Sequence, residues 1–135
     1  MNFQVIRPNG STLKAIVHVT LGRVLRATLV LKGLVIEWVV VKGCNEELGD
    51  AESEIWNESD YLVFRKLTEN ANAAMLNYNY PMYPEFSLKS FITYLHSFDT
   101  LFTDKCKKCG YHLRNHLPPT WREFKTLEPF HEDCR

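Results

Sequence analysis

Four side chains near the end of the chain have the types and the spacing of a metal site. Two residues separate Cys106 from Cys109, and His131 and Cys134 form a second pair with the same spacer after 21 intervening residues. A short spacer lets two side chains on a tight turn converge on one ion, and the long span brings the second pair round to close the site. Three thiolates and one imidazole form a soft donor set that selects zinc. We therefore expect one structural Zn²⁺ ion.

Two other uses of these residues remain open. His112 or His116 could replace His131 as the fourth ligand, although Cys109 and His112 would then crowd three ligands into seven residues. The second alternative is a redox dithiol at Cys106 and Cys109. We prefer the site with three cysteines and His131, because each of its ligands then has a partner across a two-residue spacer.

The ligand pattern does not fit a catalytic or a DNA-reading zinc site. A catalytic zinc keeps an open position for water, whereas four protein ligands leave none. Zinc deaminases place a His-x-Glu segment before a Pro-Cys-x-x-Cys segment, and here the order is reversed. A ββα finger has about twelve residues between its ligand pairs. The sequence therefore predicts no enzyme and no direct sequence-specific DNA binding.

Composition and charge limit the remaining functions. The chain has 135 residues, of which 16 are basic and 16 acidic, and 45% are hydrophobic. A net charge of zero argues against wrapping nucleic acid or lying on an anionic membrane. No signal-peptide pattern follows Met1, and no apolar run approaches the roughly 20 residues that span a bilayer. We expect a soluble intracellular chain with reduced cysteines, in which Cys44 is a half-buried free thiol.

Alternating polar and apolar residues in the first third of the chain predict β-strands. The alternation runs through residues 12–20 and 23–31, and an apolar run with β-branched residues follows at 34–41. Short turns that contain glycine separate these segments, which predicts an antiparallel meander. Phe3–Ile6 could add a fourth strand.

The hydrophobic period then changes from two to three and four residues. This change predicts amphipathic helices at about 54–78 and 85–103, separated by Pro81 and Pro84. A solvated acidic stretch, with seven acids and no base in residues 44–60, precedes the first helix. The expected fold class is α+β, in which a meander of three to four strands packs with two amphipathic helices.

The last thirty residues are expected to form a separate small module. We place its boundary so that residues 1–103 are the sheet-and-helix domain and residues 104–135 the zinc-binding module. Thr120 and Glu123 have capping-box spacing, which predicts a short helix at about 121–128 that delivers the second ligand pair. Trp121 and Phe130 should pack inside this module, because so small a unit has little else to bury.

Several stretches together resemble one protein family. The segments are Cys106-Lys-Lys-Cys109-Gly, Leu117-Pro-Pro-Thr-Trp-Arg-Glu-Phe-Lys-Thr-Leu-Glu and Phe130-His-Glu-Asp-Cys134-Arg135. Upstream they are Val19-Thr-Leu-Gly-Arg-Val-Leu, Val41-Lys-Gly and Tyr61-Leu-Val-Phe-Arg-Lys-Leu-Thr. In this order they resemble the carboxy-terminal region of the Mediator complex subunit 27 family. The resemblance covers most of the chain, but the helical amino-terminal region of that family has no counterpart in it.

The resemblance implies a function that the residues alone do not name. It implies a non-enzymatic subunit of the nuclear coactivator that links DNA-bound activators to RNA polymerase II. The expected partners are other Mediator subunits, with an indirect link to the polymerase and activators and none to a membrane. The alternative is a free-standing, zinc-ribbon-like adaptor that binds a protein or nucleic-acid partner.

The third predicted strand also suggests a docking surface. Leu34, Ile36, Trp38 and Val40 would face the two helices, and the opposite face would present Val35, Glu37, Val39 and Val41. A strand with water on one side carries polar residues there, yet three of these four are apolar. Either one helix covers each face or the second face is covered from outside. We expect an external cover, namely another Mediator subunit or the missing amino-terminal helices.

Overall fold

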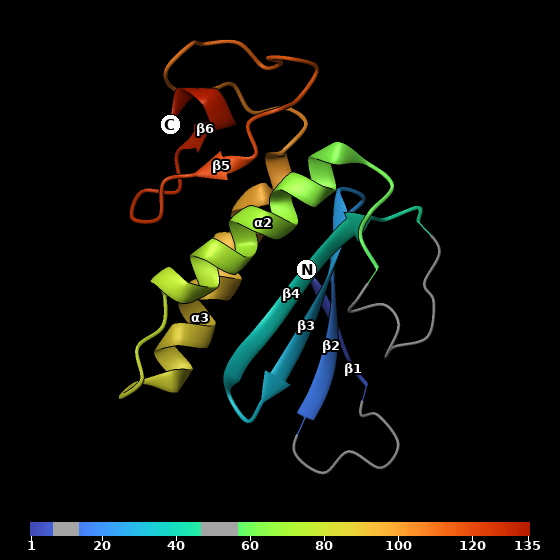
Figure 1. Ribbon diagram of the computed structural model, residues 1–135, viewed down its shortest axis with the longest axis vertical. Coiled ribbons are helices and arrows are strands. Elements are labelled where there is room, and N and C mark those ends of the chain that lie inside the picture. Colours follow the sequence, from blue (N-terminus) through green and yellow to red (C-terminus); the bar gives the residue numbers. More distant parts are fainter. Residues whose placement is uncertain (7–13, 47–56) are drawn as a thin grey trace.

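Residues 1–6, 14–46 and 57–135 are described by the computed structural model, which has the predicted α+β architecture (Figure 1). Four antiparallel strands form one sheet in the order β1-β2-β3-β4. These strands are β1 (Asn2–Ile6), β2 (Lys14–Leu21), β3 (Leu25–Lys32) and β4 (Val35–Gly43). The predicted meander is therefore confirmed, including its fourth strand at the amino-terminal end.

Glycines allow the sharp reversals between the last three strands. Gly22 has φ +52° and Gly33 has φ +62°, which are backbone conformations that L side chains rarely adopt. The β3–β4 pairing also contains an irregularity between Val30 and Leu31, beyond which the register shifts by one residue. Beyond this β-bulge, each residue of β4 lies on the opposite face of the sheet from the one that a regular alternation would give it.

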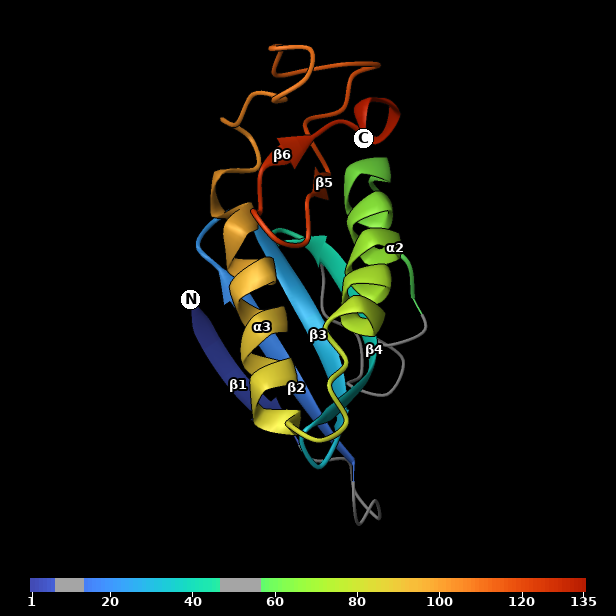
Figure 2. The same ribbon diagram turned by 90° about the vertical axis from the view of Figure 1, so that its left-hand side faces the viewer.

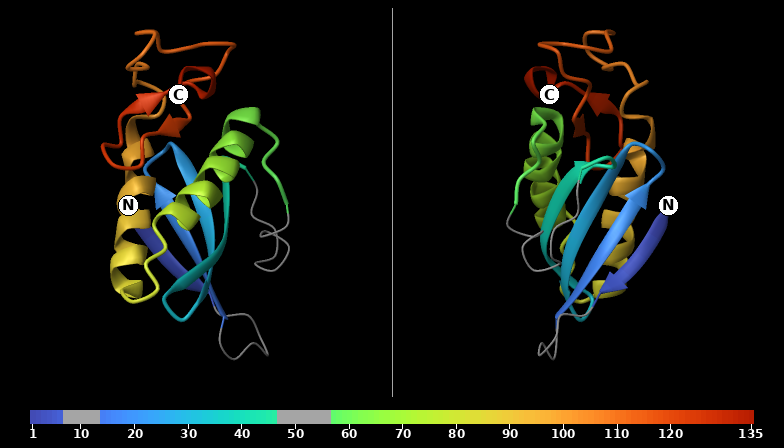
Figure 3. Two further views of the ribbon diagram at one scale, coloured as in Figure 1. Left: turned by 60° about the vertical axis from the view of Figure 1, so that its left-hand side comes forward. Right: turned by 90° about the vertical axis from the view of Figure 1, so that its right-hand side faces the viewer.

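Two helices lie side by side on the same face of the sheet (Figures 2 and 3). They are α2 (Leu62–Asn77) and α3 (Pro84–His96), and a short 3₁₀ turn, η1 (Ser97–Thr100), follows α3. The first predicted helix began too early, because residues 57–60 are not helical and Tyr61 is the residue before the first turn. Its expected beginning at 54–56 lies outside the described residues. No helix in the described part of the chain has the length and apolar character needed to cross a bilayer.

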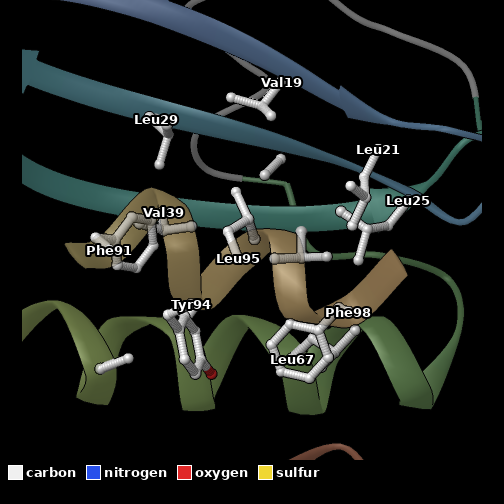
Figure 4. Packing of buried hydrophobic residues seen from close by; sticks show 14 of the residues in the cluster. Val19, Leu21, Leu25, Leu29, Val39, Leu67, Phe91, Tyr94, Leu95 and Phe98 are labelled. Atoms are coloured by element: carbon white, nitrogen blue, oxygen red, sulfur yellow. The ribbon is translucent and has the colours of Figure 1, made fainter. Parts of the chain in front are cut away.

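The hydrophobic core lies between the sheet and these helices (Figure 4). The side chains that Figure 4 labels come from both layers: Val19, Leu21, Leu25, Leu29, Val39, Leu67, Phe91, Tyr94, Leu95 and Phe98. Val39 is 0% exposed and Val41 is 1% exposed, and both belong to this core. The prediction that they form an external docking face is therefore wrong. The bulge turns them toward the helices and leaves Trp38 on the opposite face, 42% exposed.

Side chains of α2 complete the hydrogen bonding of β4 at its outer edge. The Asn72 amide donates to the carbonyl of Val39 at 2.9 Å and accepts the N–H of Val39 at 3.2 Å. The Thr68 hydroxyl accepts the N–H of Val41 at 2.9 Å. These bonds satisfy backbone groups that an edge strand otherwise leaves open.

The carboxy-terminal segment contains a two-stranded hairpin where a helix was expected. β5 (Trp121–Arg122) pairs with β6 (Pro129–Phe130), and a 3₁₀ turn, η2 (Glu132–Cys134), follows. The Glu123 carboxylate accepts the N–H groups of Lys125 and Thr126 instead of reaching back toward the preceding residues. The predicted helix at 121–128 is thus wrong, because the capping-box glutamate here closes a turn.

This hairpin packs against both helices, and its turn reaches down between them (Figure 2). Asn70 of α2 donates to the carbonyl of Thr120 at 3.0 Å. The Tyr78 hydroxyl donates to the carbonyl of Phe124, whose side chain packs against the main core. These contacts place the residues around the predicted metal ligands on a rigid base.

Candidate metal centre

The structure brings the four sequence-predicted ligands together. The ligand atoms of Cys106, Cys109, His131 and Cys134 all lie within 4.8 Å of one another. The Cys109 sulfur is 3.3 Å from Nδ1 of His131, and the Cys134 sulfur is 3.9 Å from the same nitrogen. Cys106, His131 and Cys134 are buried, and Cys109 is half-buried. This group could hold a metal ion.

A tight turn presents the first cysteine pair. The N–H of Gly110 donates to the carbonyl of Cys106 at 2.9 Å, and the N–H of Cys106 donates to the carbonyl of Tyr111 at 3.0 Å. Gly110 has φ +78°, so the turn uses a conformation that favours glycine. The N–H of Lys108 lies 3.4 Å from the Cys106 sulfur and points a positive partial charge at it. The turn therefore aims both sulfurs at one point and stabilises a thiolate.

Backbone structure also orients the second pair. His131 has an extended conformation, and the η2 turn carries Cys134 back toward it through a 2.9 Å hydrogen bond from the N–H of Cys134 to the carbonyl of His131. Nε2 of His131 lies 2.9 Å from the carbonyl of His112. Because a carbonyl only accepts, Nε2 must carry the proton, and Nδ1 keeps a free lone pair toward the sulfurs.

His112 therefore supports the site and is not one of its clustered ligands. Its Nδ1–H donates to the carbonyl of Asp104 at 2.6 Å while its own carbonyl holds His131. His116 is exposed and also lies outside the group of four. The arrangement thus favours His131 over both alternative histidines.

The dimensions of the cluster suit a tetrahedral ion. Zinc bonds of about 2.3 Å to sulfur and about 2.0–2.1 Å to nitrogen imply edges of about 3.6 Å between nitrogen and sulfur. The two sulfur–nitrogen separations at His131, 3.3 and 3.9 Å, lie on either side of that value. These two edges of the cluster therefore match the spacing that a tetrahedral zinc ion requires.

The sulfur atoms have unequal proton affinities in the absence of a cation. Burial opposes ionisation of Cys106, but hydrogen bonds from the backbone of Cys109, His131 and Lys108 outweigh it and lower the pKa of Cys106 to about 6. Burial raises the pKa of Cys134, and the neighbouring thiols Cys106 and Cys109 raise it further. A thiolate at Cys106 packed beside two further sulfurs is the electrostatic condition that a bound dication relieves.

A buried arginine beside the cluster could not be identified from the sequence. Arg122 is 1% exposed, and its guanidinium donates to Asp104 at 2.8 Å and to the carbonyl of Pro119 at 2.9 Å. It also lies 4.6 Å from the ring centroid of Phe98 in the η1 turn. The backbone carbonyl of Asp104 accepts a hydrogen bond from the His112 ring, and the backbone carbonyl of His112 in turn accepts one from His131. By holding Asp104, Arg122 therefore fixes the backbone that supports His131.

Trp121 and Phe130 are half-buried cross-strand neighbours in the hairpin. The Trp121 ring lies 4.9 Å from that of Phe124, and the guanidinium of Arg135 lies 4.1 Å above it. The predicted packing role of Trp121 fits these contacts, although its partners come from the turn and the chain end.

Comparisons with known proteins identify the family of this chain. The family model for Mediator complex subunit 27 matches residues 53–135. A relative from Aedes aegypti, named Mediator of RNA polymerase II transcription subunit 27, is 52% identical over 135 residues, which are 100% of this chain and 45% of the relative. Proteins of the same name from Drosophila melanogaster and Danio rerio are 47% and 42% identical, over 99% and 100% of this chain and 44% and 43% of their own lengths. The chain spans less than half the length of these curated relatives. The chain belongs to the Mediator complex subunit 27 family.

Proposed function

We propose that Cys106, Cys109, His131 and Cys134 bind one structural Zn²⁺ ion. The observation that carries this proposal is the convergence of three sulfurs and Nδ1 of His131 within 4.8 Å, on a buried and hydrogen-bonded backbone. Residues 104–135 then form the zinc-binding module, and residues 1–103 form the sheet-and-helix domain on which the module rests. Without the ion, the Cys106 sulfur, whose pKa is lowered to about 6, would be packed beside two further sulfurs with no cation to balance its charge.

The proposed zinc has a structural role and not a catalytic one. Four protein donors fill a tetrahedral shell, so no position remains for a water or a substrate. Two polar groups that precede the ligand pairs in the sequence or lie between them, the buried Arg122 and the partly exposed Asp104, already bond to each other, and Arg122 also bonds to the backbone. They hold the ligand loops in place instead of facing a cleft.

At the level of the cell, we propose that the chain is a non-enzymatic subunit of the Mediator coactivator. Its partners would be other Mediator subunits, and it would act in the nucleus on RNA polymerase II transcription without reading DNA sequence itself. Membership of the subunit 27 family supports this assignment. The folded core and the largely buried ligand set suit an interaction module.

Size fractionation of a nuclear extract tests this assignment. The endogenous protein carries an affinity tag, and its elution is compared with that of another Mediator subunit. We expect it to elute with the megadalton complex, and we expect a Cys134→Ser variant to be lost from that fraction. A protein found only in a small free pool would contradict the assignment and would favour the zinc-ribbon-like adaptor.

A further inference from the structure

The two edges of the sheet differ in whether another element bonds to their outward-facing backbone groups. At the β4 edge, the side chains of Asn72 and Thr68 bond to the backbone of Val39 and Val41. At the opposite edge, β1 pairs only with β2 among the described residues (Figure 3). An open strand edge presents unpaired backbone groups and is a template for another strand.

The register shows which backbone groups point outward at the β1 edge. The N–H and carbonyl of Val39 point to α2, so they cannot bond to Leu29, its cross-strand partner in β3. Leu29 must then exchange bonds with Val17 in β2, since bonding alternates along and across an antiparallel sheet. Val17 faces Val5 in the next pair, which is therefore not hydrogen-bonded. The N–H and carbonyl of Val5 consequently point away from the sheet.

The same argument applies two residues earlier. Val41 bonds to Thr68 of α2, and it pairs with Ala27. Ala27 pairs with Val19, and Val19 pairs with Phe3. Phe3 thus also directs its N–H and carbonyl outward, whereas those of Gln4, the residue between, point inward to β2.

The side chains beside these open groups are apolar and exposed. Phe3 is 55% exposed and Val5 is 60% exposed. Their cross-strand partners, Val19 and Val17, lie on the helix-covered face, so Phe3 and Val5 continue that apolar face on the edge strand, which Figure 2 shows beside α3. Phe3 and Val5 therefore have both outward-facing backbone groups and exposed apolar side chains.

We propose that the outer edge of β1 binds an extended segment of another polypeptide as a fifth strand. The backbone of that segment would bond to Phe3 and Val5, and its apolar side chains would alternate so that every second one packs beside them. A helix cannot satisfy the edge, because its own backbone groups are already bonded to each other.

A second copy of this chain fits the edge less well than a foreign segment. Antiparallel pairing of two β1 strands about Gln4 would use the five residues of each β1, whereas stable interfaces of standard size use about 20–30 residues a side. A segment tethered within a large assembly needs fewer contacts, because its effective concentration is in the millimolar range. This last argument rests on the proposed role in Mediator, but the binding chemistry does not.

Peptide selection on the purified 135-residue chain tests the proposal without using Mediator. The probe is a phage-displayed library of twelve-residue random peptides. We expect the selected peptides to carry apolar residues at alternate positions. In amide hydrogen exchange, the N–H groups of Phe3 and Val5 should exchange fast in the free chain and become protected with a selected peptide, whereas that of Gln4 should be protected in both states.

Two variants of β1 separate edge binding from other modes. Val5→Pro removes an outward N–H and no bond to β2, so peptide affinity should fall about tenfold or more. Gln4→Lys alters the opposite face of the same strand and should leave affinity within about twofold. Unchanged affinity of Val5→Pro would overturn the proposal, and so would selected peptides that protect amides elsewhere. Protection of Phe3 and Val5 that rises with protein concentration alone would assign the edge to a second copy and overturn the proposed occupant.

Discussion

Asn72 on α2 forms a two-way hydrogen-bonded pair with the backbone of Val39 on β4, at 2.9 Å from its amide nitrogen and 3.2 Å to its amide oxygen. The side-chain amide thus takes the place of the peptide group that a further strand would offer. It closes this edge of the sheet and fixes the position of α2 along β4.

Loss of this amide should destabilise the sheet edge. Asn72→Ala leaves the N–H and the carbonyl of Val39, a residue that is 0% exposed, without their partners. We expect a loss of about 2 kcal/mol in the free energy of unfolding, measured by urea denaturation. Asn77→Ala, at an exposed position of the same helix, is the control and should change stability by less than about 0.5 kcal/mol. Equal effects of the two substitutions would show that the pair with Val39 contributes nothing.

Charges on the helix-covered face of β4 should unfold the domain. Val39→Asp combined with Val41→Asp places two carboxylates in a core where the native side chains are 0% and 1% exposed. Burial of an unpaired charge costs more than a domain of this size can tolerate. Circular dichroism should show loss of the folded state. The control is Val35→Asp on the exposed part of the same strand, which should stay folded. A folded and soluble double variant would contradict this account and support the expectation that Val39 and Val41 belong to an external docking face.

Arg122 should couple the zinc-binding module to the helices. Arg122→Met removes its bonds to Asp104 and to the carbonyl of Pro119, and it leaves a carboxylate that is partly shielded from water. We expect a loss of roughly 3 kcal/mol, reduced from the larger cost of a fully buried pair because Asp104 keeps some solvent contact. Lys125→Met, at an exposed position of the same hairpin, should have little effect on the melting temperature. If both variants melt alike, Arg122 does not have this role.

Glu46 should contribute stability that acid removes. Burial opposes its ionisation, but the N–H groups of Asp60 and Gly43 and the Ser59 hydroxyl bond to the carboxylate and lower the pKa of Glu46. A group with a lowered pKa in the folded state stabilises the fold above its unfolded pKa, and this stabilisation is lost as the pH falls through the folded pKa.

The matching experiment compares Glu46→Gln with the wild-type chain at several pH values. The wild type should be more stable at pH 7, and the difference should shrink below the ordinary glutamate pKa of about 4.3. Glu58→Gln changes an exposed carboxylate in the same acidic region and should show no such trend. A stability difference that is constant from neutral to acidic pH would refute the role of Glu46.

The hydrophobic period predicted the meander and both helices, because alternation and three- to four-residue steps depend only on which face is buried. It placed Ile36 on the correct face of β4 but assigned Trp38, Val39 and Val41 to the wrong faces, since the bulge opposite Val30 and Leu31 cannot be recognised in the local pattern. The capping-box spacing of Thr120 and Glu123 misled for a similar reason. The same glutamate can close a hairpin turn, and the cross-strand pair of Trp121 and Phe130 decides between the two outcomes.

The candidate metal centre could be predicted as a cluster of Cys106, Cys109, His131 and Cys134, because cysteine and histidine spacing is itself the chemical requirement for a metal site. Its support could not be predicted. The carbonyl of His112 orients His131, and Arg122 braces Asp104, through contacts between segments 18 and 19 residues apart. The sequence does not indicate which backbone carbonyl will accept a side-chain hydrogen bond. An arginine within a capping-box pattern is expected to be a surface residue.

Metal analysis of the purified chain tests the central claim most directly. Zinc content is measured by mass spectrometry for the wild type, for Cys134→Ser and for the matched control Cys44→Ser, whose cysteine is exposed and lies outside the ligand group. We expect one zinc per chain in the wild type and in Cys44→Ser. Structural zinc contributes on the order of 10 kcal/mol to the folding of small modules, so Cys134→Ser should lose the ion and make residues 104–135 sensitive to protease. A Cys134→Ser chain with a full zinc content and unchanged protease resistance would contradict the account.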